Sequence, residues 1–345
     1  MILVAKRFHK FFILNFLLSI LFVDSFLYGA VVLNGRTMGT SYSVKLSKLP
    51  PGKTHKQLKK LIDQSLEQVN DQMSTYRPKS ELSRFNTFDK SGWFEVSTDT
   101  ARVAQRAKEI GRLLAGSFDV TIGMVVNLWG FGPRGVPTKI PSDKQLKQVL
   151  EKSGNDQLSV RMSPPAIKKK SSSLYVDLSG IAKGFGADKV SELLSSLGSR
   201  SHMVEIGGEV ATVGLKASSS PWRIAIERPN LHGKRGIQSI AELSGQSLAT
   251  SGDYRNFFEK NGKRFSHIID PRTGKPVDHK LASVSVISSK CLDADAFATG
   301  MMVLGFKEGM KLAKKNKLAV FFLLREKGGY VGYSSPEFKK YWKKK

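Results

Sequence analysis

The sequence contains a single cysteine, Cys291, in 345 residues. One thiol excludes an intrachain disulfide, so a chain of this length must rest on its apolar core. Three catalytic motifs are also missing: the phosphate-binding loop G-x-x-x-x-G-K-[ST], the zinc-protease helix H-E-x-x-H and the nucleophile elbow G-x-S-x-G. We find no internal repeat and no long low-complexity linker either. The function must therefore be sought in other residue patterns.

Acidic residues are scarce: 29 Asp and Glu stand against 55 Lys and Arg, a formal charge of +26. Such a balance favours anionic partners, namely nucleotides, nucleic acid or an acidic membrane surface. The densest basic runs, Lys168–Lys170 and Lys339–Lys345, are typical of a solvated loop and tail. No zinc finger or RNA-binding aromatic motif accompanies the charge, so we expect no nucleic-acid partner.

Long apolar runs are limited to Phe11–Val23, which follows the basic residues Lys6, Arg7 and Lys10. The run has the length of a signal-peptide core and is short for a membrane span. We expect residues 1–29 to be a signal peptide, either removed or retained as an uncleaved anchor. Residues 30–345 would then form one exported domain, on the periplasmic side in a bacterial context. No cysteine follows the leader to accept a lipid.

Helical spacing and strand-like runs predict an α+β fold. A capping box at Thr54–Gln57 opens one helix, and Thr98 or Asp99 caps a second through Leu114. Short β-rich runs separated by turn residues cluster after His202, which indicates a largely antiparallel sheet flanked by helices. Further helices are predicted over 142–150, 181–197, 294–304 and 307–314, and strands over 174–178, 202–206, 210–215, 222–226, 237–243, 265–269, 281–287, 318–324 and 330–333.

The segment from Cys291 to Gly300 would place Asp295 and Thr299 four residues apart on one helix face. A carboxylate beside a hydroxyl is a pair of hard oxygen ligands that suits Mg²⁺. The alternative is a helix-start acid and a hydroxyl bonded to its own helix. His267, beside the Asp-Pro turn of Ser266–Gly274, is either a packed core histidine or a functional residue at a strand end.

Several glycine-bearing segments allow two interpretations. Gly130–Gly135 matches G-x-G-x-x-G, but prolines follow it and no helix starts there, so we interpret it as a loop. Asp177–Gly186 lies where a strand meets a helix, and it is either a structural turn or a phosphate site. In the second case Lys183 could pair with a phosphate. Glu205–Glu209 is interpreted as a bulge unless a ligand approaches its paired glycines closely. Thr250–Asp253 is either an ordinary hairpin turn or a turn whose hydroxyls and main-chain N–H groups hold an anionic oxygen.

Taken in order, these segments resemble the ApbE family, the FAD:protein FMN transferases. Any one segment is weak, whereas eight in the right order are specific, and they span nearly all of the chain after the leader. The matching segments are Met38–Thr40, Met73–Pro78, Gly116–Asp119 continuing to Leu128–Gly132, Asp177–Gly184, Gly207–Gly208, Thr250–Gly252, Ser266–Gly274 and Ala294–Thr299.

The resemblance implies a T-fold-related α+β architecture and Mg²⁺-dependent transfer of FMN from FAD to a Thr or Ser hydroxyl of a target protein, with release of AMP. It implies that Asp295, Thr299 and a carbonyl near Gly180 bind Mg²⁺ and that His267 activates the acceptor hydroxyl, as base or orienter. The positions implied to contact FAD are Met38, Tyr76, Ser117, Phe118, Asp119, Asp177, Lys183 and Ile269.

The implied targets are subunits of membrane electron-transport complexes, either sodium-pumping NADH:quinone oxidoreductase or its Rnf-type relatives. We therefore expect a periplasmic location, attached to the inner membrane if the leader is retained. Two alternatives stay open at this point. Water as the acceptor would give an Mg²⁺-dependent FAD pyrophosphatase that yields FMN and AMP, and loss of turnover would leave a periplasmic FAD-binding protein.

Overall fold

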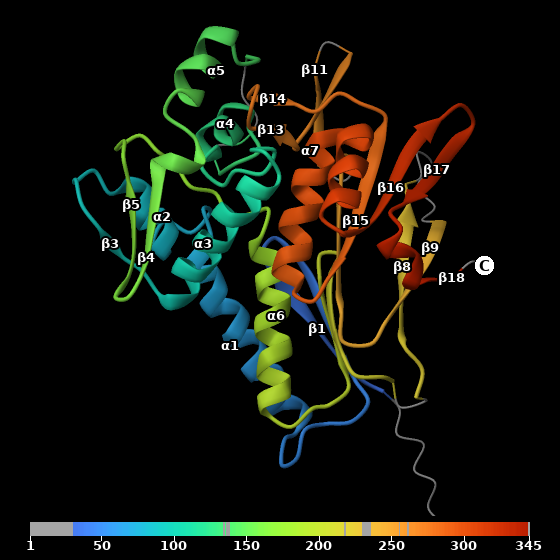
Figure 1. The fold of residues 1–345 in the computed structure, drawn as a ribbon. Helices are drawn as coiled ribbons and strands as arrows, with labels where there is room; N and C mark the ends of the chain where they lie inside the picture. The colour runs from blue at the N-terminus through green and yellow to red at the C-terminus, as the bar shows by residue number, and fades with distance from the viewer. Residues whose placement is uncertain are drawn as a thin grey trace, which may run out of the picture.

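The computed structural model describes residues 30–343, apart from 134, 136–138, 217–218, 230–235, 255 and 261. An eight-stranded sheet, antiparallel at every pairing, forms its centre (Figure 1). The predicted α+β class with a largely antiparallel sheet is therefore confirmed. In sheet order the strands are β1 (Val31–Thr37), β2 (Thr40–Leu46), β6 (His202–Ile206), β7 (Glu209–Val213), β10 (Ser247–Gly252), β15 (Leu281–Ser288), β16 (Ala319–Glu326) and β17 (Gly329–Ser334).

Helices α6 (Ala182–Ser196) and α7 (Cys291–Lys315) lie side by side on one face of this sheet (Figure 1). Their buried side chains pack on the inward residues of β2, β6 and β15. Non-helical backbone at Gly305 interrupts α7, in agreement with the two predicted helices there. The other helices are α1 (His55–Met73), α2 (Glu81–Thr87), α3 (Thr98–Leu113), α4 (Gly123–Leu128) and α5 (Asp143–Leu150).

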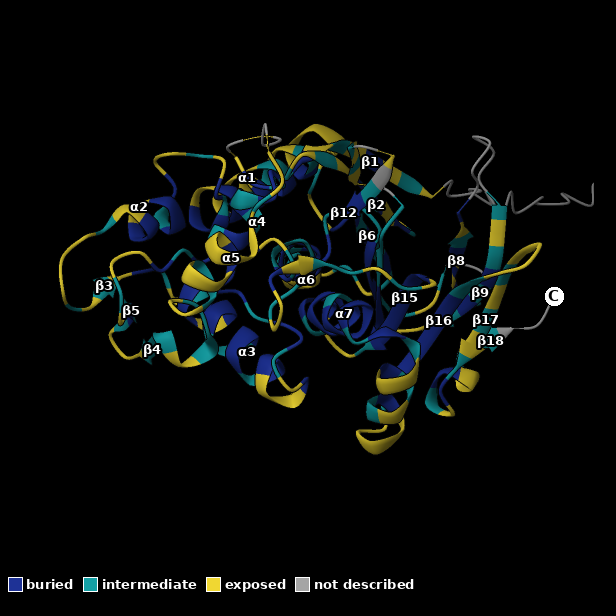
Figure 2. Cartoon of the chain, turned by 90° about the horizontal axis from the view of Figure 1, so that it is seen from above, coloured by how far each residue is buried: buried dark blue, intermediate teal, exposed yellow. Residues whose placement is uncertain are grey.

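A small sheet covers part of the opposite face (Figure 2). It consists of β18 (Trp342–Lys343), β9 (Gly236–Leu243) and β8 (Trp222–Arg228), in that order. Trp222, Ile224 and Ile226 of β8 face a core shared with β10, β15 and β16. The remaining strands pair as β3 (Phe94–Glu95), β5 (Pro165–Lys169) and β4 (Leu158–Met162), as β11 (Phe257–Lys260) with β12 (Lys263–Ser266), and as β13 (Ile269–Asp270) with β14 (Lys275–Pro276).

Some local predictions are wrong, each for a physical reason. The predicted strand 174–178 makes only one bridge, between Tyr175 and Ile122. Its backbone is instead held by the Asn86 side chain, which exchanges two hydrogen bonds of 2.8 Å with Val176. The second helix is capped by Ser97, one residue before the predicted candidates.

Two further predictions near the site need correction. Thr250–Asp253 is mostly strand, because residues up to Gly252 pair with β15. The predicted strand 265–269 is divided between β12 and β13. The predicted signal peptide, residues 1–29, lies outside the described residues. Across the part of the chain that is described, no helix has the length and apolarity needed to span a membrane.

Candidate active site

A cleft of about 400 Å³ opens where β10, α6 and α7 meet the loops before α4 and β13. It brings together all the residues that the sequence singled out, although their segments are far apart along the chain. The predicted FAD-contacting, metal-binding and catalytic positions that line it are Met38, Tyr76, Ser117, Phe118, Asp119, Asp177, Gly180, Lys183, His267, Ile269, Asp295 and Thr299. Their individual roles stay predictions.

Met38 enters the cleft because of the turn that joins β1 to β2. Both Met38 and Gly39 have positive φ angles, 48° and 72°. A non-glycine residue rarely adopts this conformation, which the surrounding fold must hold in place. The Met38 side chain reaches α6, where a Cβ on Gly186 would lie 2.8 Å from its Cε. A glycine at position 186 therefore leaves the room that Met38 occupies.

The loop between α3 and α4 supplies Ser117, Phe118 and Asp119. Asp119 Oδ1 accepts hydrogen bonds from the Thr121 backbone N–H at 2.8 Å and from its hydroxyl at 2.7 Å. Burial raises the pKa of Asp119, against the lowering effect of these two bonds. One carboxylate oxygen is thus fixed by the loop, and the other remains for a polar group of a ligand.

Asp177 and Tyr76 form another wall. Asp177 Oδ1 accepts from the Ser179 backbone N–H at 2.9 Å, which fixes the turn before α6. Tyr76 follows α1, is 62% exposed, and donates its hydroxyl to the Phe131 carbonyl at 3.0 Å. Partial burial, and then the charge of Asp177, raise the pKa of Tyr76. An exposed aromatic ring at the rim offers a stacking surface for a planar ligand.

Lys183 lies in the first turn of α6 and meets two buried carboxylates. Its Nζ is 2.8 Å from Glu209 Oε1 and 3.7 Å from Asp295 Oδ1. Burial lowers the pKa of Lys183, but the charges of Asp295 and Glu209 outweigh it, so the net shift is upward. Burial raises the pKa of Glu209 to about 8. The ammonium group therefore stays charged at the cleft, where it can attract a phosphate.

Asp295 and Thr299 both lie on α7, which confirms the predicted helix. Asp295, 2% exposed, accepts the Gly184 backbone N–H at 2.9 Å through Oδ2, which leaves Oδ1 toward the cleft. Thr299 Oγ1 is 3.2 Å from Ser251 Oγ. A Cβ on Gly180 would lie 3.5 Å from Thr299 Oγ1, so the Gly180 turn adjoins the same oxygens.

This donor set suits Mg²⁺, because it consists of a carboxylate, two hydroxyls and a main-chain turn. In addition, Glu209 Oε2 is buried and has no hydrogen-bond partner within the described structure. The described residues contain no cluster of three His, Cys, Asp or Glu side chains able to hold a metal. Mg²⁺ commonly keeps water and substrate phosphate oxygens as ligands, so a sparse protein share fits that metal.

His267 lines the same cleft. Its Nδ1 lies 2.8 Å from the Asn256 carbonyl oxygen, which can only accept. Nδ1 therefore carries the proton, and Nε2 of the neutral ring keeps a lone pair. Burial lowers the pKa of His267, which favours that neutral form. The Phe131 ring packs edge-on at 6.3 Å between centroids and limits rotation of the imidazole.

Sequence reasoning missed several lining residues, chiefly Glu209, Phe131 and Asn256. The only signal for Glu209 was its place after the Gly207–Gly208 pair, which was interpreted as a bulge. In the structure, this turn places Glu209 Oε1 2.8 Å from Lys183 Nζ. Ser251 was inside a segment taken as a turn, and it instead bonds to Thr299.

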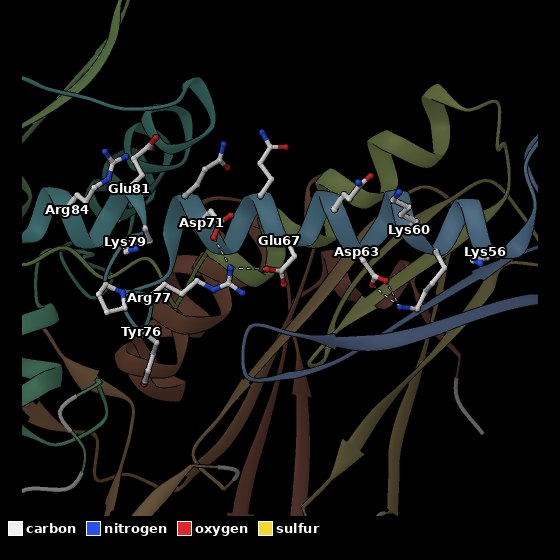
Figure 3. Close-up of a pocket in the computed structure, with 16 residues that line it drawn as sticks. Lys56, Lys60, Asp63, Glu67, Asp71, Tyr76, Arg77, Lys79, Glu81 and Arg84 are labelled. Atoms are coloured by element: carbon white, nitrogen blue, oxygen red, sulfur yellow. Dashed lines mark hydrogen bonds and ion pairs between the residues drawn. The ribbon is translucent and has the colours of Figure 1, made fainter.

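A larger groove, of about 1260 Å³, runs along the outer surface of α1 toward α2 (Figure 3). Several of its charges pair with one another: Arg77 lies 2.8 Å from Glu67 and 2.7 Å from Asp71, and Lys59 lies 2.6 Å from Asp63. Only Tyr76 is shared with the cleft that holds the other predicted residues. This groove has the character of a solvated, ion-paired helix face, so the smaller cleft is the better candidate for chemistry.

Comparisons with known proteins agree with this choice. The family model described as ApbE family matches residues 38–322. The FAD:protein FMN transferase of Vibrio cholerae is 45% identical over 314 residues, 91% of this chain and 93% of the relative. The one from Haemophilus influenzae is 43% identical over 320 residues, 90% of this chain and 91% of the relative.

Solved structures are similar as well. The flavin transferase ApbE from Vibrio cholerae has a TM-score of 0.83 at 43% identity and covers 91% of this chain and 99% of its own. The apo form of Pseudomonas stutzeri flavinyl transferase ApbE has a TM-score of 0.82 at 36% identity, over 91% of this chain and 97% of its own.

Proposed function

This chain belongs to the ApbE family, and we infer from this that it is an FAD:protein FMN transferase. The expected family resemblance is thereby confirmed. The observation that carries the inference is the cleft itself: an imidazole whose Nδ1 meets a carbonyl oxygen lines the same space as a cationic lysine and a set of hard oxygen donors. We propose further that the reaction depends on Mg²⁺ and that the acceptor is a Thr or Ser hydroxyl.

The reaction requires one bond to form and one to break. The acceptor oxygen bonds to the phosphorus of the FMN half of FAD, and the bond from that phosphorus to the bridging oxygen breaks. The electron pair leaves with AMP. The hydroxyl proton goes to Nε2 of His267, because a neutral alcohol is a poor nucleophile near pH 7. Asn256 holds the ring by its Nδ1–H throughout.

Lys183 and the proposed metal site stabilise the negative charge of the FAD diphosphate. Lys183 pairs with a diphosphate oxygen and is held there by Glu209. Asp295, Thr299 and the Gly180 turn would hold Mg²⁺, which neutralises the diphosphate and orients it when bound. Ser117, Phe118, Asp119, Asp177, Met38, Tyr76 and Ile269 line the rest of the cleft and are proposed to position FAD.

We propose a periplasmic location, with inner-membrane attachment if the leader is retained. The support is the basic-then-apolar pattern of residues 6–23. The proposed acceptors are flavin-bearing subunits of sodium-pumping NADH:quinone oxidoreductase or Rnf-type complexes.

To test the proposed FMN transfer, the protein is incubated with FAD and Mg²⁺, with and without an acceptor domain from such a subunit. Flavin fluorescence is then followed on a denaturing gel, and AMP is assayed in the same tubes. A fluorescent acceptor band that disappears with EDTA is expected. AMP and FMN without a labelled band would instead favour the pyrophosphatase. Bound FAD without AMP would leave a binding protein.

Asp295→Asn tests the metal site. We expect it to lose EDTA-sensitive transfer, because the amide loses the negative charge that attracts the cation. Asp293→Asn, two residues earlier in α7, is the matched control, since Asp293 pairs with Arg106 outside the cleft. Full transfer by Asp295→Asn would remove the metal assignment.

The variant His267→Asn tests whether His267 acts as the general base. We expect transfer to slow by about 10²–10⁴-fold while FAD still binds. His279→Asn is the control, because His279 bonds the Met302 carbonyl and does not line the cleft. Loss of FAD binding in His267→Asn would make this residue a binding element instead.

A further inference from the structure

A second groove, of about 850 Å³, continues from the cleft on the far side of the large sheet. Gly207 and Thr250 line both the groove and the cleft. The groove therefore reaches the turn before Glu209 and the end of β10, where Ser251 contacts Thr299. Its walls are β8 on one side and the outer face of β2 and β6 on the other. A chain lying in it would therefore end beside the reacting groups.

Strand β8 presents a free edge to this groove. Among the described residues it has one strand neighbour, β9, and no strand pairs with its other edge over Trp222 to Ala225. Four consecutive residues, Trp222 to Ala225, line the groove, which places it along the strand edge rather than against one face. An edge of this kind pairs readily with an extended peptide through main-chain hydrogen bonds.

The floor of the groove is a sheet face that the small sheet leaves open. The apolar core beneath β8 and β9 joins them to β10, β15 and β16. Over β2 and β6 the outward residues Ser41, Lys45 and Glu205 are exposed or half-buried. One more strand beside β8 would extend the second layer over this open face, as in aligned sheet packing.

The charges of the groove favour an acidic occupant. Its basic side chains outnumber the acidic ones, and Glu205 is already bonded to the Gly208 N–H at 2.7 Å. Complementary charge speeds and orients docking of a partner. The basic residues are Lys45, Lys216, Arg223 and Arg228, and the acidic ones are Glu205 and Glu227.

We propose that an extended, acidic segment of the acceptor protein pairs with the free edge of β8 and runs past Gly207 and Thr250, which delivers its hydroxyl to His267. This docking mode rests on the proposed FMN transfer. It explains how a buried reaction centre receives a protein substrate: the acceptor enters as a single strand. The same groove, rather than the ion-paired one on α1, then determines which proteins are modified.

Site-directed crosslinking tests the contact. Cys291 is buried, so Ala225→Cys gives the full chain one accessible thiol for a photoreactive maleimide. Ala225 is exposed on β8, and Lys60→Cys on α1 is the control. With the acceptor domain of a sodium-pumping NADH:quinone oxidoreductase subunit present, we expect a crosslink to that domain from position 225 and none from position 60. A crosslink from 225 only to residues 1–29 of the chain or to a second copy would overturn the proposal.

Charge reversal tests whether the basic residues of the groove contribute to acceptor binding. We expect the pair Lys45→Glu and Arg223→Glu to raise KM for the acceptor roughly tenfold, with FAD binding unchanged. Lys60→Glu makes the same kind of change on α1 and should leave KM unaltered. Normal transfer by the native protein, combined with an unchanged acceptor KM in the groove variant, would refute the docking mode alone. No transfer by the native protein would refute the proposed function itself.

Discussion

At the scale of single residues, the candidate site concentrates charge where water is scarce. Lys183 meets Glu209 and Asp295, which are 3% and 2% exposed. For Glu209, burial penalises the charged form of the carboxyl group. The pKa of Glu209 is thereby raised to about 8. The protonation of Glu209 should therefore change the field that a bound diphosphate experiences.

This leads to a pH prediction for FAD binding. Because burial raises the pKa of Glu209 to about 8, a rise in pH through that value adds negative charge beside Lys183 and the diphosphate. We expect the affinity for FAD to fall roughly fivefold as the pH rises from 7 to 9, which corresponds to about 1 kcal/mol of charge repulsion. Glu209→Gln should abolish this fall, whereas Glu192→Gln, in an exposed pair with Lys290, should keep it. A titration of flavin fluorescence at each pH measures the effect.

Buried His202 gives a prediction about stability. Burial lowers its pKa to about 4, and its two ring nitrogens lie within hydrogen-bond distance of the hydroxyls of Ser191 and Ser199. Between pH 6.5 and 4 the unfolded chain binds a proton that the folded chain does not. The free energy of unfolding should therefore fall by up to about 3 kcal/mol as the pH drops through that window.

Urea unfolding at several pH values checks this expectation. His202→Gln should lose part of the acid sensitivity, whereas His55→Gln, at an exposed position, should keep all of it. Equal acid sensitivity in the native protein and in His202→Gln would mean that another group is responsible.

Every site residue predicted from the sequence lines the cleft, because the segments that carry these residues match family motifs in order. Glu209 could not be predicted in the same way. Its pairing with Lys183 depends on how the turn at Gly207 and Gly208 packs against α6. This packing is a tertiary contact, which local sequence does not reveal. Nothing in the local sequence distinguishes a buried glutamate that follows two glycines from a solvent-exposed glutamate at such a position.

At the scale of elements, the contact between α6 and α7 positions Asp295. A Cβ on Gly184 would lie 2.4 Å from the Cys291 carbonyl oxygen and 2.8 Å from Asp295 Cβ. The two helices approach so closely only because this position has no side chain. Asp188 of α6 strengthens the contact, accepting the backbone N–H groups of Cys291 and Leu292 at 2.9 Å each.

Gly184→Ala should therefore push the helices apart. We expect a loss of about 1–3 kcal/mol in unfolding free energy, typical of overpacking, together with loss of transfer. Gly186→Ala, two residues further along α6, would meet the flexible end of Met38 at 2.8 Å and Ile206 Cδ1 at 3.3 Å. It should cost less stability but weaken FAD binding. Denaturant unfolding and FAD titration of both variants separate the two effects, and a Gly184→Ala protein of native stability would contradict this packing argument.

The helices that begin with a capping box were predicted, whereas α2, which is capped by Ser80, and the first hairpin were not predicted at all. The Thr54 capping box and α1 coincide, as do Ser142 and α5. The β1–β2 turn instead uses Met38 and Gly39 rather than the Asn-Gly pair that usually marks a tight hairpin. The extended segment 174–178 has strand composition, but its hydrogen bonds go to the side chain of Asn86, which composition cannot reveal.

At the scale of the whole molecule, charge should govern the encounter with substrate. The formal charge of +26 attracts an anion from a distance, and salt screens that attraction. Raising NaCl from 50 to 500 mM should increase KM for FAD several-fold. Binding of riboflavin, which lacks phosphates, serves as the uncharged control and should change little. An equal salt response for both ligands would show that long-range charge is unimportant.

The order of strands in the large sheet also has a temporal consequence. Strand β2 pairs with β6, from Leu46 opposite His202 to Tyr42 opposite Ile206. The first hairpin therefore finds its partner only after about 150 further residues have been made. At about 5–20 residues per second, the ribosome needs on the order of ten seconds to supply them. During that interval the central sheet cannot close, because β2 lacks the strand that pairs with its second edge.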